Sequence, residues 1–182
     1  GPGNDSIAGW AGDDVISGGT GVDSLVGGLG FDRLVESGAG AITLSNTLYQ
    51  VGNEYNAIAE FETVTLTGSN GPDSFNLSGW TLPATIDGGG GSNTIIDGGN
   101  GNFTLTETSL GRTIGAATRT LALANIQNAT LGGGIGNNGF NLTAWPYTAT
   151  LRGESGSDTF SVAGDVDYTL NDFVLLRPGL GM

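Results

Sequence analysis

Short runs of alternating apolar and polar residues recur along the chain, each followed by glycine, serine, asparagine or threonine. Examples are VTLTG from Val64, ATIDG from Ala84 and NFTLT from Asn102. Runs of roughly four to six residues with this alternation are typical of short β-strands joined by tight turns. No stretch has the periodicity of an amphipathic helix, and glycine at this density disfavours helices. The pattern predicts an all-β protein.

The chain also repeats itself over a longer distance. The segment Phe61–Ile95 matches Ile126–Phe160 at an offset of 65, so that Trp80 aligns with Trp145. Internal repeats set the architecture of a protein, because each repeat buries its apolar face against its neighbours. We therefore divide the chain into a first block at 1–36, long units at 37–101 and 102–166, and the start of a third unit at 167–182.

Both kinds of repeat place apolar residues at intervals of about nine to eleven, which fits a parallel β-solenoid. Each strand with its turn would form half a coil, and coils would stack about 4.8 Å apart. About fifteen strands would give seven or eight coils. The segments 45–60 and 106–125 break the rhythm, and we expect each to form an extra hairpin or an enlarged coil on the flank. The run TRTLALANI, from Thr118 to Ile126, is predicted as one further strand there.

The first 35 residues are written in rows of nine. GGTGVDSLV and GGLGFDRLV, from Gly18 to Val35, are complete, and PGNDSIA and GWAGDDVIS before them are weaker copies. Aligned, the rows form a glycine column, an aspartate column and an apolar column: Gly3, Gly12, Gly21 and Gly30; Asp5, Asp14, Asp23 and Asp32; Ile7, Ile16, Leu25 and Leu34.

The aspartate column predicts a metal site. Rows 18 residues apart lie on the same side of a two-sided coil, so Asp5 would stack on Asp23 and Asp14 on Asp32. Unpaired carboxylates about 5 Å apart would repel one another. Calcium takes six to eight oxygen ligands from carboxylates and backbone carbonyls. We therefore expect Ca²⁺ in these turns, with its binding free energy contributing to folding.

The rows resemble the hemolysin-type calcium-binding repeat, the RTX nonapeptide, over residues 3–35. The resemblance implies a right-handed β-roll, which would continue into a β-helix, and export to a calcium-rich exterior. It assigns Asp5, Asp14, Asp23 and Asp32 as carboxylate ligands, with Gly3, Gly12, Gly19, Gly21, Gly28 and Gly30 as carbonyl donors. Beyond residue 36 the chain is similar to the longer repeats of large bacterial surface proteins.

The long units keep part of this motif. Asp73 and Asp158 stand in the ligand position, whereas Asn93 and Asn138 replace aspartate in the other rows. Each aspartate would share an edge with an asparagine 20 residues away. An Asp–Asn pair carries one negative charge, so we expect weak calcium binding or none, with asparagine ladders in place of metal. The alternative for Asp73 and Asp158 is a turn-capping aspartate that accepts hydrogen bonds from its own backbone.

Composition narrows the function. The chain has 18 acidic residues against five arginines, a formal net charge of −13, and no lysine, histidine or cysteine. This charge disfavours binding to nucleic acid or to an anionic membrane surface. No apolar run is long enough to insert into a membrane as a helix. The missing bases and nucleophiles predict a protein that is not an enzyme, although a carboxylate pair could cleave polysaccharide.

These patterns predict an extracellular, calcium-stabilised structural protein of a bacterial cell surface. It would be a slice of an adhesin or stalk with covalently adjacent repeats, or a filament subunit whose ends stack head to tail. The alternative is an accessory module of an exported polysaccharide-active enzyme. Trp80 and Trp145 could contact carbohydrate, but a turn tryptophan folded over the coil edge is favoured. Replacing Asp23 or Asp32 should affect calcium-dependent folding more than replacing Asp87 or Asp97.

Overall fold

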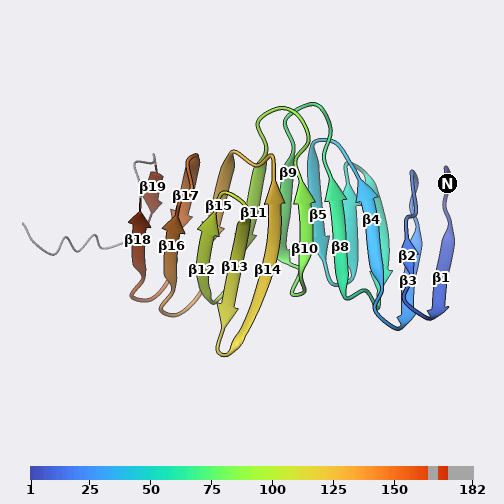
Figure 1. Cartoon of the computed structure of the whole chain (residues 1–182), viewed down its shortest axis with the longest axis horizontal. Helices are drawn as coiled ribbons and strands as arrows, with labels where there is room; N and C mark the ends of the chain where they lie inside the picture. Colours follow the sequence, from blue (N-terminus) through green and yellow to red (C-terminus); the bar gives the residue numbers. More distant parts are fainter. Residues whose placement is uncertain (164–167, 172–182) are drawn as a thin grey trace, which may run out of the picture.

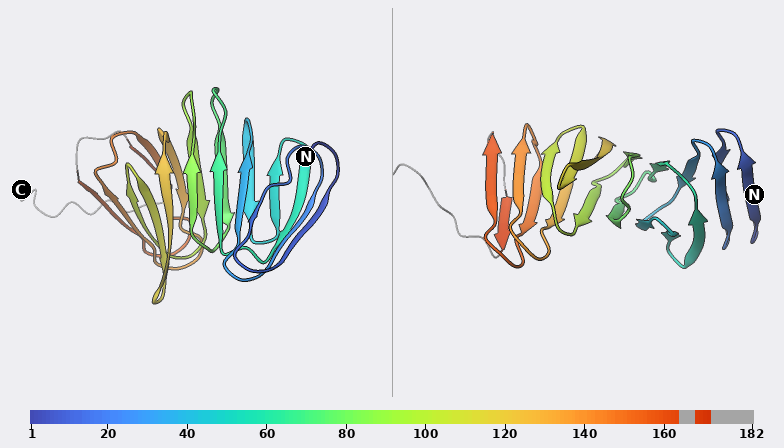
Figure 2. Two further views of the ribbon diagram at one scale, coloured as in Figure 1. Left: turned by 45° about the vertical axis from the view of Figure 1, so that its right-hand side comes forward. Right: turned by 90° about the horizontal axis from the view of Figure 1, so that it is seen from below.

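The computed structural model describes residues 1–163 and 168–171, and over these residues it contains strands and turns but no helix. The predicted all-β fold is confirmed. Two mixed sheets face each other along an elongated stack (Figures 1 and 2). In the part of the chain described, no helix is therefore present that could cross a membrane.

The chain order of strands differs from their spatial order. The ten-stranded sheet contains, in spatial order, β1 (Ser6–Ala11), β3 (Ser24–Leu29), β7 (Glu54–Ala59), β6 (Leu48–Val51), β5 (Ala41–Ser45), β9 (Ser74–Gly79), β11 (Thr94–Gly98), β15 (Asn128–Gly132), β17 (Thr148–Arg152) and β19 (Tyr168–Asn171). The nine-stranded sheet contains β2 (Val15–Ile16), β4 (Arg33–Ser37), β8 (Thr63–Thr67), β10 (Ala84–Asp87), β14 (Ala117–Ala124), β13 (Ser109–Ile114), β12 (Asn102–Thr106), β16 (Gly139–Thr143) and β18 (Thr159–Ala163).

The first four strands alternate between the two sheets. Strand β1 pairs in parallel with β3, with Ile7 opposite Leu25. Strand β2 pairs in parallel with β4, with Ile16 opposite Leu34. Residues 18 apart thus lie side by side, as the nine-residue rows predict. Two consecutive strands, one in each sheet, make one coil of the stack.

The two insertions do not lie on the flank, and this part of the prediction is wrong. Strands β5, β6 and β7 form an antiparallel meander inside the ten-stranded sheet, between β9 and β3. Strands β12, β13 and β14 do the same inside the nine-stranded sheet, between β16 and β10. Each meander fills three strand positions where an ordinary coil fills one. The described part of the chain therefore has nineteen strands instead of about fifteen, and its sheets are mixed instead of purely parallel.

Only β19 of the predicted third unit, 167–182, belongs to the described residues. It pairs in parallel with β17, with Leu170 opposite Leu151. Residues 164–167 and 172–182 lie outside the described residues. The pairing of β19 continues the ladder of the second long unit by one further strand.

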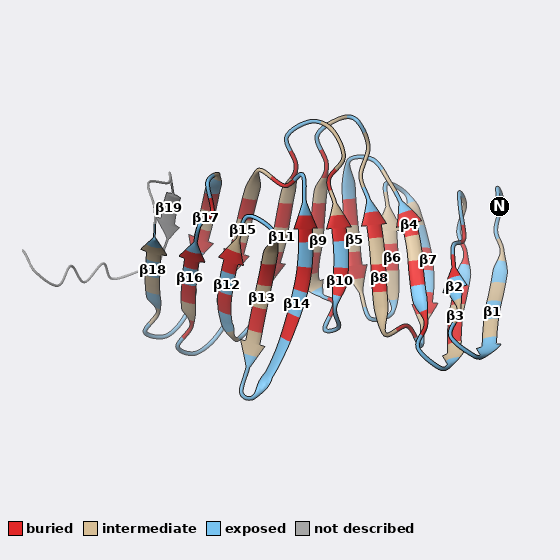
Figure 3. Ribbon diagram, viewed as in Figure 1, coloured by how far each residue is buried: buried red, intermediate tan, exposed pale blue. Residues whose placement is uncertain are grey.

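The core lies between the sheets, where alternate residues of each strand point inward (Figure 3). Phe103 and Phe140 stack within it, with ring centroids 5.2 Å apart. Trp80 and Trp145 are each 1% exposed, and their indole N–H groups donate to the carbonyls of Pro83 and Thr148 at 3.2 Å. The tryptophans therefore fold over the coil edge, as favoured, and are not exposed for stacking on sugar rings.

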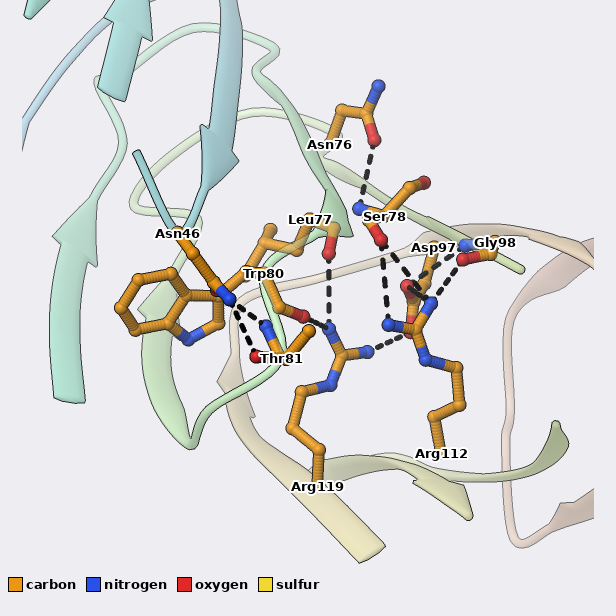
Figure 4. A network of polar contacts seen from close by, with 10 residues as sticks. All are labelled: Asn46, Asn76, Leu77, Ser78, Trp80, Thr81, Asp97, Gly98, Arg112 and Arg119. Carbon is orange, nitrogen blue, oxygen red and sulfur yellow. Dashed lines mark hydrogen bonds and ion pairs between the residues drawn. The ribbon is translucent and has the colours of Figure 1, made fainter. Parts of the chain in front are cut away.

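A buried ion network fastens the second meander to the opposite sheet (Figure 4). Asp97, on β11, is 1% exposed and pairs with Arg112 at 2.9 Å and with Arg119. The arginines are cross-strand partners on β13 and β14. Arg119 also donates to the carbonyls of Leu77 and Trp80. Asp97 is thus no neutral control for the ligand aspartates, because its removal leaves two buried cations unpaired.

Candidate metal centre

The predicted ligands gather along the two edges of the stack. We call the turns that enter the ten-stranded sheet the first edge, and those that enter the nine-stranded sheet the second edge. Asp5 and Asp23 precede β1 and β3 on the first edge, and the Ser24 N–H donates to the Asp5 carbonyl at 2.9 Å. Asp14 and Asp32 precede β2 and β4 on the second edge. The structure thus brings together the aspartates that the 18-residue spacing pairs.

One oxygen of each inner aspartate is used within the protein. Asp23 Oδ1 accepts a hydrogen bond from the Asp5 N–H at 2.9 Å, and Asp32 Oδ1 accepts one from the Asp14 N–H at 2.8 Å. Asp23 is 3% exposed and Asp32 is fully buried. Each side chain therefore caps the turn of the preceding coil, and its position is fixed by that bond.

The other oxygen has no such partner. Oδ2 of Asp14, Asp23 and Asp32 is buried without a hydrogen-bond donor. A buried carboxylate oxygen without compensation costs several kcal/mol, as an order of magnitude. A hard divalent cation ligated by oxygens would remove this cost, and carboxylate and carbonyl oxygens are the ligands that calcium prefers. The donor set of these turns therefore fits Ca²⁺.

Glycines make room for these oxygens. A Cβ on Gly9, Gly18 or Gly27 would lie less than 3.0 Å from the Oδ2 atom of the aspartate five residues later. A Cβ on Gly9 would also lie 2.5 Å from the carbonyl oxygen of Gly27, so this carbonyl and Asp14 Oδ2 flank the same space. The sequence argument did not include these three glycines among the site residues, although each stands first in its row.

The glycines predicted as carbonyl donors lie in the turns themselves. All six have positive φ, from 97° to 145°: Gly3, Gly12, Gly19, Gly21, Gly28 and Gly30. A Cβ on Gly21 would collide with the backbone of Gly3, and one on Gly30 with the backbone of Gly12. Consecutive turns therefore stack backbone on backbone, with their carbonyls at the edges. Their role as calcium ligands stays a prediction.

Three residues beyond the rows join this arrangement and were missed from sequence. The Asp23 N–H donates to Asn56 Oδ1, and the Asp32 N–H donates to Glu62 Oε2, both at 2.7 Å. Glu36, which is 6% exposed, accepts the Gly18 N–H at 2.6 Å. Burial raises the pKa of the Glu36 carboxyl, and its bond to Gly18 lowers it in part. A signal existed for Glu36, since it follows Gly9, Gly18 and Gly27 at the same nine-residue interval.

Asp73 and Asp158 differ from each other. Asp73 Oδ2 accepts the N–H of Ser69 at 2.6 Å and its hydroxyl at 3.0 Å, and Oδ1 accepts the N–H of Gly40. Both oxygens are satisfied, which favours the turn-capping alternative for Asp73. Asp158 Oδ1 accepts the Asn138 N–H at 2.8 Å, but its Oδ2 is buried without a partner. Asp158 thus keeps the feature that points to a cation.

The first 34 residues match a family model, that of the RTX calcium-binding nonapeptide repeat, in four copies. These nonapeptide repeats bind Ca²⁺, and proteins that carry them are typically secreted by bacteria. The comparison with curated proteins gave no match. Within the described residues no three acidic, histidine or cysteine side chains cluster as metal ligands. Each site would therefore rely on carbonyl oxygens beside one or two carboxylates.

Proposed function

We propose that this chain, whose first 34 residues are RTX calcium-binding nonapeptide repeats, is an extracellular structural β-solenoid of a bacterial cell surface. The observation that carries the proposal is the set of buried, unpartnered oxygens on Asp14, Asp23 and Asp32. These coils would be destabilised without calcium and stabilised with it. Right-handed winding belongs to the proposal, because parallel strands joined by a crossover are right-handed in nearly all proteins.

The energetics suit a switch between the inside and the outside of a cell. Extracellular calcium modules have Kd values of about 10⁻⁴ to 10⁻³ M. With calcium at about 1 mM and a Kd of about 10⁻⁴ M, each site would stabilise the fold by about 1.4 kcal/mol. Three such sites would supply about 4 kcal/mol, a large part of the stability of an ordinary domain. The coils would then fold on reaching calcium-rich medium.

The arrangement of the long units supports a structural role. Each holds seven strands, β5 to β11 and β12 to β18. Because seven is odd, equivalent strands fall in opposite sheets, as β9 and β16 do. Each further unit would extend the same stack without closing it. We propose a non-catalytic stalk or adhesin segment with adjacent repeats, or a filament subunit whose coils stack on a second copy.

Sedimentation velocity of residues 1–182, chelated and then with millimolar calcium, tests this proposal. A slow, extended species that becomes more compact and stays monomeric would support a calcium-folded module of a longer rod. Growth into large particles on adding calcium would support the filament. An identical sedimentation coefficient in both conditions would overturn the calcium-dependent fold.

A further inference from the structure

The chain contains the same turn twice, once with acids and once with amides. The acidic copy, 59–63, follows β7, and the amide copy, 124–128, follows β14. Glu60 and Asn125 both have positive φ, 59° and 55°. The aligned residues are Glu60 with Asn125, Phe61 with Ile126, and Glu62 with Gln127. The two copies are therefore geometric counterparts that differ in charge.

Each turn makes the same bonds to the coil before it. In the acidic copy, the N–H groups of Glu62 and Thr63 donate to the Asp32 carbonyl at 3.1 and 3.3 Å. The Asp32 N–H in return donates to the Glu62 side chain at 2.7 Å. Asp32 is thus enclosed by the turn that follows it in the stack.

The amide copy repeats this pattern around Asn93. The N–H groups of Gln127 and Asn128 donate to the Asn93 carbonyl at 3.0 and 2.9 Å. The Asn93 N–H donates to Gln127 Oε1 at 2.8 Å. Asn93 therefore occupies the position of Asp32, with an amide where the first copy has a carboxylate.

In the amide copy a side-chain NH₂ group links the backbone oxygens. Asn93 Nδ2 donates to the carbonyls of Asn125 at 2.9 Å and Gly90 at 3.0 Å. A Cβ on Gly88 would lie less than 3.0 Å from both Asn93 Nδ2 and the Asn125 carbonyl oxygen, which places the two atoms beside one glycine. The donor satisfies the carbonyls, and no ion is needed.

In the acidic copy the donor is missing. A Cβ on Gly27 would lie 2.8 Å from Asp32 Oδ2 and still closer to the Glu60 carbonyl oxygen, so the two oxygens flank one glycine. Asp32 Oδ2 is buried and has no hydrogen-bond donor. Two acceptor oxygens side by side repel each other unless a cation lies between them.

We propose that a calcium ion binds between the Asp32 carboxylate and the Glu60 main-chain carbonyl, with the Glu62 carboxylate as second anionic ligand. Glu62 gives one oxygen to the Asp32 N–H, which leaves the other for the ion. The two carboxylates balance the charge of the ion, and all ligands are the hard oxygens that calcium prefers. The proposal rests on calcium binding by the nonapeptide coils.

This site extends the calcium-binding region beyond the nonapeptides. The family match ends at residue 34, whereas Glu60 and Glu62 lie after the first meander. The ion would therefore tie β5–β7 to the coil that contains Asp32. In the amide copy, hydrogen bonds replace the ion, so the same fold would continue without calcium.

Calcium binding to the full chain, measured by isothermal titration and equilibrium dialysis, tests the site. Glu62→Gln keeps an acceptor for the Asp32 N–H, as Gln127 does for Asn93, and should lose one calcium or weaken one site at least tenfold. Asn93→Asp with Gln127→Glu should gain one calcium. Two control variants, Glu60→Asn, which keeps the carbonyl, and Glu107→Gln, on the exposed surface, should bind as the parent does.

The outcomes separate this inference from the function on which it rests. If the parent binds calcium and Glu62→Gln binds the same number with the same affinity, the site is wrong while the proposed function stands. If Asn93→Asp with Gln127→Glu gains no calcium, the acid-to-amide argument is wrong. If the parent binds no calcium, the proposed function fails, and this site with it. Thermal unfolding of each variant with a chelator reports whether the fold survives the substitution.

Discussion

Asp97→Ala should destabilise the stack more than any other aspartate substitution outside the calcium turns. Asp97 lies in the core of the ten-stranded sheet and pairs with two arginines, each 6% exposed. Alanine would leave both guanidinium groups buried without their anion. The cations cannot reach water unless β13 and β14 leave the core.

The expected loss can be worked out from this geometry. Removing one partner of a buried ion pair costs about 3–5 kcal/mol. For a domain of this size, 1 kcal/mol shifts the melting temperature by about 2–4 °C. The variant should therefore melt roughly 6–20 °C below the parent in saturating calcium. The β13–β14 hairpin should be the first segment cleaved by protease.

Asp87→Ala is the matched control. Asp87 is half-buried, and its pKa is lowered by its bonds to Asn125 Nδ2 at 2.7 Å and the Gly89 N–H at 2.9 Å. Losing such partly exposed bonds costs about 1 kcal/mol or less. Circular dichroism melts in calcium compare the two variants. Equal melting temperatures would refute the view that the ion network holds the second meander in place.

Two other substitutions follow from the same packing. Gly18→Ala would press a Cβ against the Asp23 carboxylate, so calcium affinity should fall at least tenfold in titration calorimetry, whereas Gly111→Ala, with no neighbour closer than 3.8 Å, should change stability by less than about 1 kcal/mol. Unaltered affinity in Gly18→Ala would contradict the position of that carboxylate. Burial, aided by the charge of Glu36, raises the pKa of the Tyr49 phenol. Its neutral form is favoured in the fold, so stability should be lost as pH rises above about 10, and Tyr49→Phe should flatten this loss in alkaline melts. An unchanged pH profile would show that Tyr49 is not the group responsible.

The periodic parts of the fold could be predicted because their information is local. Alternation marks each strand, and the nine-residue rows fix which coils are neighbours, so that Leu25 faces Ile7. The pairing of Asp14 with Asp32 follows directly from that register. Sequence rhythm is sufficient wherever each half-coil contributes one strand.

The meanders could not be predicted from rhythm alone. Their strands alternate like the others, but nothing local says that β5 advances beyond β6 and β7 in the sheet. Contacts that depend on this path were missed for the same reason. Glu62 meets Asp32 only because the first meander returns the chain to the coil it left. Arg112 and Arg119 reach Asp97 only because the second meander does the same.

The degenerate turns show a further limit of sequence reasoning. Asparagine was expected to replace metal by forming ladders, and Asn93 does accept the Asp73 N–H at 2.8 Å. Its amide also bridges two carbonyls, which a carboxylate could not do without a cation. Asp73 and Asp158, identical in motif, differ because Ser69 supplies donors to one of them. Such differences depend on a single neighbouring side chain.

Hydrogen–deuterium exchange of the full chain, with calcium and with a chelator, tests the central claim most directly. The account predicts that removing calcium abolishes protection in β1, β2 and β3, where carboxylate oxygens are buried without donors. Protection in β9, β11 and β15 should persist, because Asp73, Asn93 and Gln127 satisfy these turns by hydrogen bonds alone. Equal protection of both regions with and without calcium would contradict the account.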